Sequence, residues 1–393
     1  MLALSKKDQS YLDKLLTEVT QPFKKSAIIT KKAVSESKQM NKDMIELYSD
    51  YLIASFGQTT ATGLANLLQG SIYHDSITRF LNSETLTAKE QWQLIKPMLR
   101  QHENATPNAI GYLIFDDTIQ PKPHTSVDDI NCWHYDHTQN KNVKGINLLN
   151  CLYHRKDIDI PLNFDIITKS NVFTDDKGKV KRKSDKTKNQ RLLDMFDRAI
   201  KNQVKFDYVL ADSWFSAKAT FKHIRKANKH FIFALKSNRL VALTPDDREK
   251  GNFVRIDESN LPDNTPVHGF LNDYHDEVLL LRRVFTNKDD STGVLYLVCS
   301  DLQCDKDKFI NGYQKRWQVE VYHKSLKQNA NLGKSPAHSQ RARFNHMFLA
   351  TYAVFKLECL KIKTKLNHFA LRLKLLVSAN QSAFAQLKAI SGA

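Results

Sequence analysis

The order of apolar runs between residues 109 and 235 constrains the fold more than any other feature of this 393-residue chain. Three runs of strand length come first, and a helix, a strand, a second helix and a last strand follow them. The runs are Ala109–Phe115, Asn142–His154 and Ile158–Thr168, the helices are Lys186–Gln203 and Ala217–Asn228, and the later strands are Phe206–Leu210 and His230–Leu235. This order predicts a mixed α/β fold, with an antiparallel meander that continues into parallel βαβ units. Several α/β folds fit it at this level of detail.

The chain is strongly basic, which restricts the partners that we expect. Lys and Arg number 59 against 42 Asp and Glu, a net charge of +17. Such an excess favours a polyanion, with nucleic acid first and an anionic membrane surface second. No apolar run is long enough to span a membrane, and the charged start MLALSKKDQSYLDKLL is unlike a secretory signal, so no membrane contact and a cytoplasmic location are expected. The five cysteines lack Cys-x-x-Cys spacing and are expected to be ordinary thiols.

The regions around the core differ from it in the spacing of their apolar residues. Residues 1–105 show helical spacing without a convincing strand, and we predict a helical N-terminal DNA-binding domain there. The core would begin with residues 106–238, be interrupted by a β-rich insertion at 239–300, and resume with a helix that carries a glutamate at 301–335. Residues 336–393 are predicted to form a helical C-terminal region for dimerisation or DNA contact.

Residues Thr60–Asn82 have the length and punctuation of a helix-turn-helix, since Gln69-Gly70-Ser71 separates two short amphipathic stretches. The second stretch would then present these residues to a major groove: Tyr73, His74, Ser76 and Arg79. An ordinary helical hairpin that ends one helix at Gly70 explains the pattern equally well.

Two basic segments also fit a nucleic-acid partner. Lys177–Lys188 reads as a basic loop before a helix, and Leu366–Leu376 combines Arg and Lys with apolar residues. Charge runs often form a solvated surface without a partner, and for each segment this interpretation is as good as a nucleic-acid contact. The second segment would also fit a dimer contact.

The helix predicted over Phe309–Gln328 carries the most informative pattern. At ~100° per residue its polar stripe is roughly 80° wide, and it consists of Tyr313, Arg316, Glu320, Lys324 and Lys327. Apolar residues opposite this stripe are Val319, Tyr322 and Leu326, and those on its flank, also expected to be buried, are Ile310, Trp317 and Val321. A carboxylate among cations with buried neighbours suits a cleft where a metal ion and phosphates meet. A surface helix with Glu320 and Lys324 paired at i, i+4 is the simpler alternative.

Other carboxylates follow predicted strands. Asp116 and Asp117 come after the run that begins at Ala109, and Asp212 comes after the strand that begins at Phe206. Strand ends of α/β sheets commonly carry functional groups, and a two-metal site needs carboxylates from distant segments. An Asp in such a position is also a common turn former.

The spacing Tyr313-x2-Arg316-x3-Glu320-x6-Lys327 resembles the Tyr-Arg-Glu-Lys signature of a large class of bacterial insertion-sequence transposases. The resemblance extends to the neighbouring Trp317, His323 and Lys324, and it covers roughly residues 109–334. Members of that class have a DDE triad on an RNase H-like core. The resemblance therefore implies an RNase H-like catalytic core with a β-rich insertion.

The resemblance further implies that Asp117, Asp212 and Glu320 coordinate two Mg²⁺ ions, with Mn²⁺ as a substitute. Asp117 is preferred over Asp116 because the first aspartate of the class directly precedes a threonine, and both neighbours on one strand cannot be equivalent ligands. DNA phosphates would be contacted by Tyr313, Arg316, Lys324 and Lys327. An aromatic residue of the insertion holds a flipped base in well-known relatives; the insertion here has no Trp, and its candidates are Phe253, Phe270 and Phe285.

The predicted function is that of a DNA transposase, which cuts the ends of its mobile element by metal-dependent hydrolysis and joins the 3′-OH ends to target DNA. By analogy it would act as a homodimer on DNA, near the bacterial nucleoid. Two alternatives stay open. One is a metal-dependent nuclease without strand transfer, and the other is a non-catalytic DNA-binding protein derived from a transposase.

Overall fold

The computed structural model describes residues 35–83, 85–136, 139–287 and 289–391. The chain divides into two compact units, Met1–Leu47 and Tyr48–Ala393. Residues 48–54 of helix α2 (Ser35–Ala54) belong to the second unit. Residues 1–34 of the predicted N-terminal domain lie outside the described part.

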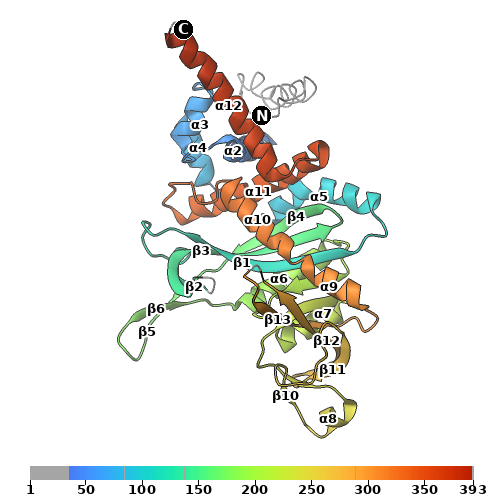
Figure 1. Ribbon diagram of the computed structural model, residues 1–393. Helices are drawn as coiled ribbons and strands as arrows, with labels where there is room; N and C mark the ends of the chain where they lie inside the picture. The colour runs from blue at the N-terminus through green and yellow to red at the C-terminus, as the bar shows by residue number, and fades with distance from the viewer. Residues whose placement is uncertain (1–34, 84, 137–138, 288, 392–393) are drawn as a thin grey trace. The chain divides into compact units, whose positions relative to one another are not determined.

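The centre of the second unit is a mixed sheet (Figure 1). Strand β1 (Gly111–Pro121) pairs antiparallel with β3 (Lys141–Arg155), and β3 pairs antiparallel with β4 (Ile158–Ile166). On its other side β1 is parallel to β7 (Tyr208–Ala211), which is parallel to β8 (His230–Leu235). The order β4-β3-β1-β7-β8, with an antiparallel meander and two parallel strands, is that of an RNase H-like core. The predicted fold class is confirmed.

The predicted β-rich insertion is confirmed as strand, and it extends the core sheet. Its elements are β9 (Leu240–Ala242), α8 (Pro245–Glu249), β10 (Val254–Arg255), β11 (Val267–Leu271), β12 (Tyr274–Thr286) and β13 (Thr292–Cys299). Because β13 pairs antiparallel with β8, the sheet continues from the core as β8-β13-β12-β11-β9-β10. With β2 (Cys132–Asp136) on β3, the described residues form one sheet of eleven strands.

Helices cover both faces of the core strands. Helix α6 (Lys188–Lys201) buries Leu192, Met195 and Phe196 against the sheet, and α7 (Lys218–Lys226) stacks Phe221 on Phe231 of β8, with 4.3 Å between ring centroids. Helices α9 (Lys306–Gln314) and α10 (Trp317–Gln328) pack on β8 and β1, and α11 (Gln340–Thr364) packs on β4. Apolar burial on both faces explains the nearly continuous apolar runs of the central strands.

The remaining helices lie before and after the core. They are α3 (Ala61–Leu67), α4 (His74–Leu81), α5 (Ala88–Ala105) and α12 (His368–Ser391). The turn between α3 and α4 holds Gly70 at φ +76°, and α4 exposes Arg79 while burying Ile77 and Phe80. A two-helix unit is therefore present over Thr60–Asn82, and its insertion in a DNA groove stays a prediction. Among the described residues no helix combines the length and apolarity that a membrane span requires.

The single helix predicted over Phe309–Gln328 is wrong, because the chain makes a tight turn at Lys315 and Arg316. The backbone N–H of Lys315 donates to Gly312 and that of Arg316 donates to Tyr313, so the i→i+3 pattern replaces the α-helical one. Tyr313 thus ends up on α9, and Arg316 precedes the first turn of α10.

Gly111 is required where β1 approaches the segment that leads into β7. A Cβ at this position would lie 2.5 Å from the carbonyl oxygen of Lys205 and 2.9 Å from Cα of Phe206. We expect Gly111→Ala to lower the free energy of unfolding by roughly 1–3 kcal/mol, because backbone must shift to admit the methyl group.

Urea unfolding of both proteins measures this difference. Gly57→Ala is the matched control, since a Cβ at Gly57 has no neighbour within 4 Å. Equal stability of the two alanine variants would contradict the described approach of β1.

Candidate active site

The two neighbouring aspartates lie inside β1, not after it as the sequence suggested. The strand continues to Pro121 because β3 pairs with it over its full length, with Asp116 opposite Asn150 and Asp117 opposite Leu149. On the other side, pairing with β7 ends at Ile114. The carboxylates therefore lie where β1 has one free edge.

Asp212 follows β7 directly and comes level with Asp116. The parallel register pairs Ile114 with Leu210, and extending this offset by two residues brings Asp116 beside Asp212. Residues at equal positions on neighbouring strands share a face of the sheet. Asp116 and Asp212 thus form the strand-borne part of one acidic site.

Asp116 and Asp117 face opposite sides of the sheet. Asp116 accepts a hydrogen bond of 3.3 Å from the guanidinium of Arg316, beside α10. Asp117 faces α6: Nζ of Lys188 lies 2.8 Å from both of its carboxylate oxygens, and Nδ2 of Asn147 donates to it at 2.8 Å. Successive side chains of a strand alternate in direction, so Asp116 shares the face of α10 and Asp117 that of α6.

The acidic groups around Asp116 destabilise its charged form. Burial raises the pKa of Asp116 to about 8; the charge of Arg316 lowers it, whereas those of Asp212, Glu320 and Asp117 raise it further. Burial also raises the pKa of Asp212. The site therefore holds more negative charge than Arg316 can neutralise, which is the condition that a bound cation relieves.

Three potential ligands meet at this point: one ligand atom from each of Asp116, Glu320 and His323 lies within 4.8 Å of the others. His323 is buried, which lowers its pKa to about 3, so the imidazole is neutral and able to ligate. Its Nε2 lies 3.0 Å from Nδ2 of Asn150, and the hydroxyl of Tyr322 donates to the same asparagine. Carboxylate oxygens suit Mg²⁺, and an added imidazole suits Mn²⁺. The donor set thus fits a divalent cation.

From the sequence, His323 was predicted only as a neighbour in the signature. Its separation of three residues from Glu320 puts both side chains on one side of α10, and this spacing is the signal that could have found it. Lys188 was also missed as a partner of Asp117, because nothing in the sequence shows which helix faces that carboxylate.

The predicted cationic residues are placed at different distances from the acidic group. The guanidinium of Arg316 lies 3.7 Å from Glu320 and 5.9 Å from the ring centroid of Tyr313, which is itself buried. Burial lowers the pKa of Lys327, while the charges of Asp136 and Glu320 raise it. Lys324 is exposed, and its Nζ lies 5.3 Å from the ring centroid of Phe369 on α12.

The expected burial of the flank of α10 is wrong in part. Val319, Tyr322 and Leu326 are buried as predicted, but Trp317 is 64 % exposed and Val321 is 41 % exposed. Two apolar side chains therefore remain at the surface beside the acidic residues.

A polar cavity of about 390 Å³ opens beside Asp212. It is lined by Trp214, Lys236, Asn238, Arg239, Asn272 and others, from the loop after β7, the β8–β9 turn and the β11–β12 turn. Trp214 is 52 % exposed, and Nζ of Lys236 lies 4.4 Å from its ring centroid. The backbone N–H of Trp214 donates to Asp212 at 3.0 Å, which connects the cavity to the acidic group. Trp214 was not among the aromatic residues that the sequence singled out.

Comparison with known proteins identifies two matching families. The sequence matches the family described as "DDE superfamily endonuclease" over residues 32–252, and the one described as "Archaeal putative transposase ISC1217" over residues 158–370. No curated protein matches it.

Solved structures similar to this one include the Mos1 strand transfer complex, with 10 % identity, coverage of 59 % of this chain and 67 % of that chain, and a TM-score of 0.18. The mariner Mos1 paired end complex with Mg has 11 % identity, coverage of 58 % and 67 %, and a TM-score of 0.17. Each family match spans more than half of the sequence. The chain therefore belongs to the DDE superfamily of endonucleases and transposases.

Proposed function

We propose that this chain is a DNA transposase of the Tyr-Arg-Glu-Lys class, which frees 3′-OH ends at the borders of a mobile element and joins them to target DNA. The observation that carries the proposal is the convergence of Asp116, Asp212, Glu320 and His323 around Arg316, within a chain of the DDE superfamily. Three of these residues come from separate segments of the chain, as phosphodiester cleavage by paired metal ions requires.

The carboxylates of Asp116, Asp212 and Glu320 would hold Mg²⁺ or Mn²⁺, two ions per site. A divalent cation there polarises the scissile phosphodiester and lowers the pKa of the attacking water or 3′-hydroxyl. Arg316, now paired with Asp116 and Glu320, is in position to bind a non-bridging phosphate oxygen once those charges are neutralised. Tyr313 would support the guanidinium, and Lys324 and Lys327 would contact phosphates further along the strand.

The first carboxylate comes from a pair, and two arguments point to different members. The resemblance assigns the role to Asp117. The side-chain arrangement supports Asp116, since this residue faces Arg316 and Glu320 while Asp117 is paired with Lys188. We propose Asp116 as the ligand and Asp117 as a neighbour whose charge Lys188 compensates.

The positive charge of the chain supports binding to DNA. By analogy with the class that the signature resembles, two copies would hold the two ends of the element, in the bacterial cytoplasm. The two-helix unit α3–α4 would contribute to recognition of these ends.

Glu320→Gln keeps the size of the side chain and removes its charge. We expect it to reduce Mn²⁺-dependent cleavage of supercoiled DNA at least about 100-fold, because it removes one ligand of the cation. DNA binding in EDTA should stay within a few-fold of the parent protein. Glu249→Gln, an exposed change on α8, is the matched control and should leave cleavage unchanged.

A strand-joining assay distinguishes transposition from simple hydrolysis. A pre-nicked duplex that ends in the element's border and carries a 3′-OH should become joined to a target plasmid. Cleavage without joined product would assign the chain to nucleases, and unchanged cleavage by Glu320→Gln would remove Glu320 from the site.

A pair of carboxamide variants tests the first ligand. Asp116→Asn should abolish cleavage and weaken Mn²⁺ binding, because it removes an acidic neighbour of Glu320. Electron paramagnetic resonance of Mn²⁺ measures the binding. Asp117→Asn should retain measurable cleavage, since Lys188 already compensates that carboxylate. The reverse result would favour the residue that the resemblance selects.

The raised pKa of Asp116 predicts how metal-free stability depends on pH. The carboxyl titrates near its ordinary value of 3.8 when unfolded and at about 8 when folded, so the free energy of unfolding should fall as pH rises through this interval. Asp116→Asn removes that titration, and its stability relative to the parent should increase with pH. Urea unfolding in EDTA measures both; added Mn²⁺ should stabilise the parent at pH 7 and reduce the difference. A difference independent of pH would contradict the burial of this acid.

A further inference from the structure

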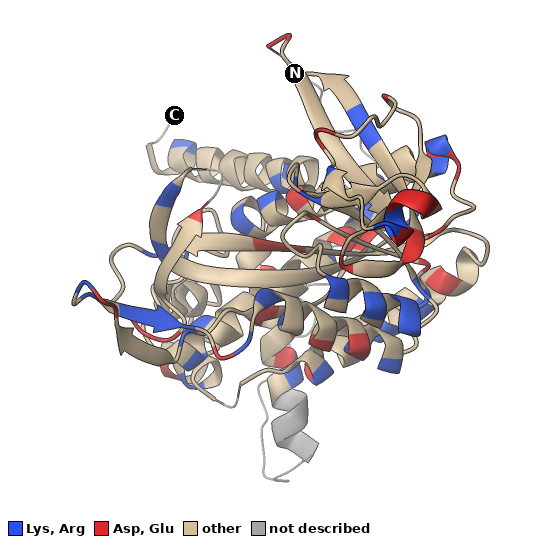
Figure 2. Ribbon diagram, turned by 90° about the horizontal axis from the view of Figure 1, so that it is seen from below, with Lys and Arg blue, Asp and Glu red and all other residues tan. Residues whose placement is uncertain are grey.

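Strands β5 (Asn171–Thr174) and β6 (Val180–Lys183) form a hairpin that is not part of the main sheet. It projects at the left of Figures 1 and 2, and its second strand carries Lys and Arg almost throughout. The side chains are exposed along the whole hairpin, except for Asp175 and Arg182, which are partly covered. A projecting strand pair with so little buried surface has no evident role in the core, so we call Asn171–Lys183 the basic arm and ask what it binds.

The tip of the basic arm is an ordered turn. The carboxylate of Asp175 accepts the backbone N–H groups of Lys177 and Lys179 at 3.0 and 2.9 Å, and its own N–H donates to the carbonyl of Lys179 at 2.9 Å. Gly178 supplies the positive φ, +72°, that this turn needs. Asp175 also pairs with Lys181 at 2.8 Å. Asp175, one of the two acidic residues at the tip, is thus occupied in holding the turn.

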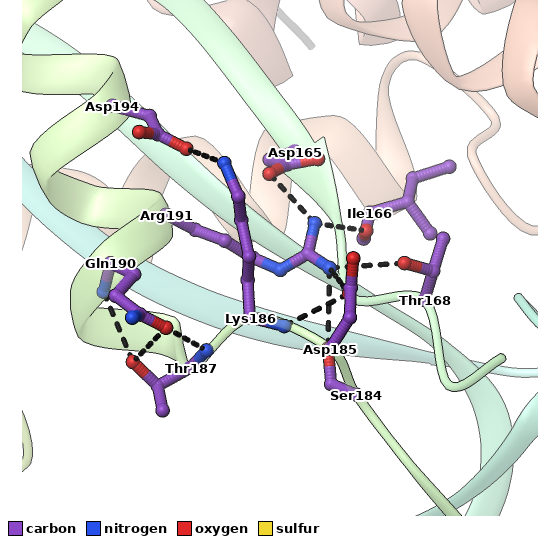
Figure 3. A network of polar contacts seen from close by, with 10 residues as sticks. All are labelled: Asp165, Ile166, Thr168, Ser184, Asp185, Lys186, Thr187, Gln190, Arg191 and Asp194. Atoms are coloured by element: carbon purple, nitrogen blue, oxygen red, sulfur yellow. Dashed lines mark hydrogen bonds and ion pairs between the residues drawn. The ribbon is translucent and has the colours of Figure 1, made fainter. Parts of the chain in front are cut away.

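The base of the basic arm is fixed to the core. Arg182 forms an ion pair with Asp129 at 2.6 Å. Arg191 of α6 is buried and binds Asp165 of β4 at 2.9 Å and the oxygens of the residues after the arm, Ser184 and Asp185, at 3.2 Å each (Figure 3). The chain then enters α6 through a capping box of Thr187 and Gln190. Because Arg182 and the residues that follow the arm are held by the core, the arm projects in a fixed direction.

The basic arm carries more positive charge than its own acids use. Five Lys and Arg residues stand against two Asp, so 5 − 2 gives +3. Among the ion pairs found in the described residues, none includes Lys177, Lys179 or Lys183. The antiparallel register puts Phe173, Lys181 and Lys183 on one face of the hairpin, and Val172 and Arg182 on the other. One face therefore combines ammonium groups with an aromatic ring that is 46 % exposed.

The chain that follows the arm reaches the strand that carries the acidic site. Five residues after Lys183, Lys188 contacts both oxygens of Asp117, which lies beside Asp116 on β1 but faces α6. A polyanion that lies along the arm would therefore continue past the start of α6, on the α6 side of β1.

We infer that the basic arm binds duplex DNA, with Lys177, Lys179 and Lys183 on phosphates and the Phe173 face toward a groove. A two-stranded β-ribbon fits the major groove in width, and unpaired ammonium groups on a preorganised scaffold are what phosphate contacts require. The identity of the polyanion as DNA rests on the proposed function. The contact itself needs no catalysis, and this separates the two tests.

Salt dependence of binding measures the contact. The protein is titrated into a fluorescently labelled DNA duplex of random sequence, in EDTA and at several salt concentrations, with Glu320→Gln as the parent to prevent cleavage. Lys177, Lys179 and Lys183 are replaced together by Ala. The negative slope of log K against log salt should then decrease in magnitude by roughly 0.9 for each lost phosphate contact, about 2.7 in all. The thermal midpoint should not change, because the three side chains are exposed.

A matched control removes the same charge elsewhere. Lys218, Lys222 and Lys226 of α7 are also exposed, and their triple alanine variant should leave the slope within experimental error of the parent. An unchanged slope in the arm variant, or an equal loss in both variants, would overturn the proposal. A change in self-association of the arm variant by sedimentation, without a change in slope, would identify a protein contact and also overturn it.

Cleavage by the otherwise unmodified arm variant is measured separately. If the arm variant shows a weaker salt dependence of DNA binding but the parent never cleaves DNA, the arm proposal stands and the proposed activity is removed. If the salt dependence is the same in both and the parent cleaves and joins DNA, the activity stands and the arm proposal is removed.

Discussion

The candidate active site depends on how its negative charge is balanced. Burial raises the pKa of Asp116, the charges of Asp212 and Glu320 raise it further, and Arg316 is the cation paired with both Asp116 and Glu320. Burying like charges is unfavourable unless a cation compensates them. The fold tolerates the excess because the carboxylates lie at the free edge of β1, where a ligand can reach them. The same excess is what makes the site suitable for divalent metal chemistry.

The tight turn between α9 and α10 determines where the compensating charge lies. The i→i+3 bonds at Lys315 and Arg316 separate two helices, and α9 buries Tyr313. Arg316 lies within reach of the ring of Tyr313 and is paired with both Asp116 and Glu320. The signature residues therefore describe two packing elements, and their spacing reflects a turn as much as a helix face.

The sequence predicted the strand order well, because each central strand is covered on both faces and must be apolar over its whole length. It predicted the end of β1 poorly, since Asp-Asp-Thr is typical of a turn and only pairing with β3 keeps these residues extended. The choice between Asp116 and Asp117 could not be made from local pattern, because it depends on which helix covers which face. Lys188 and Trp214 were missed for the same reason: their partners are distant in the chain. His323 differs, because its spacing from Glu320 is a local signal.

The pairing of β13 with β8 has a consequence for how the insertion relates to the rest of the chain. Without it, β8 would be the last strand of the core and would present unpaired backbone groups along a strand of buried residues. Such an edge recruits other chains and promotes aggregation. The insertion therefore caps the core sheet, and a truncated chain that lacked it would be expected to lose solubility before it lost any recognition of a ligand.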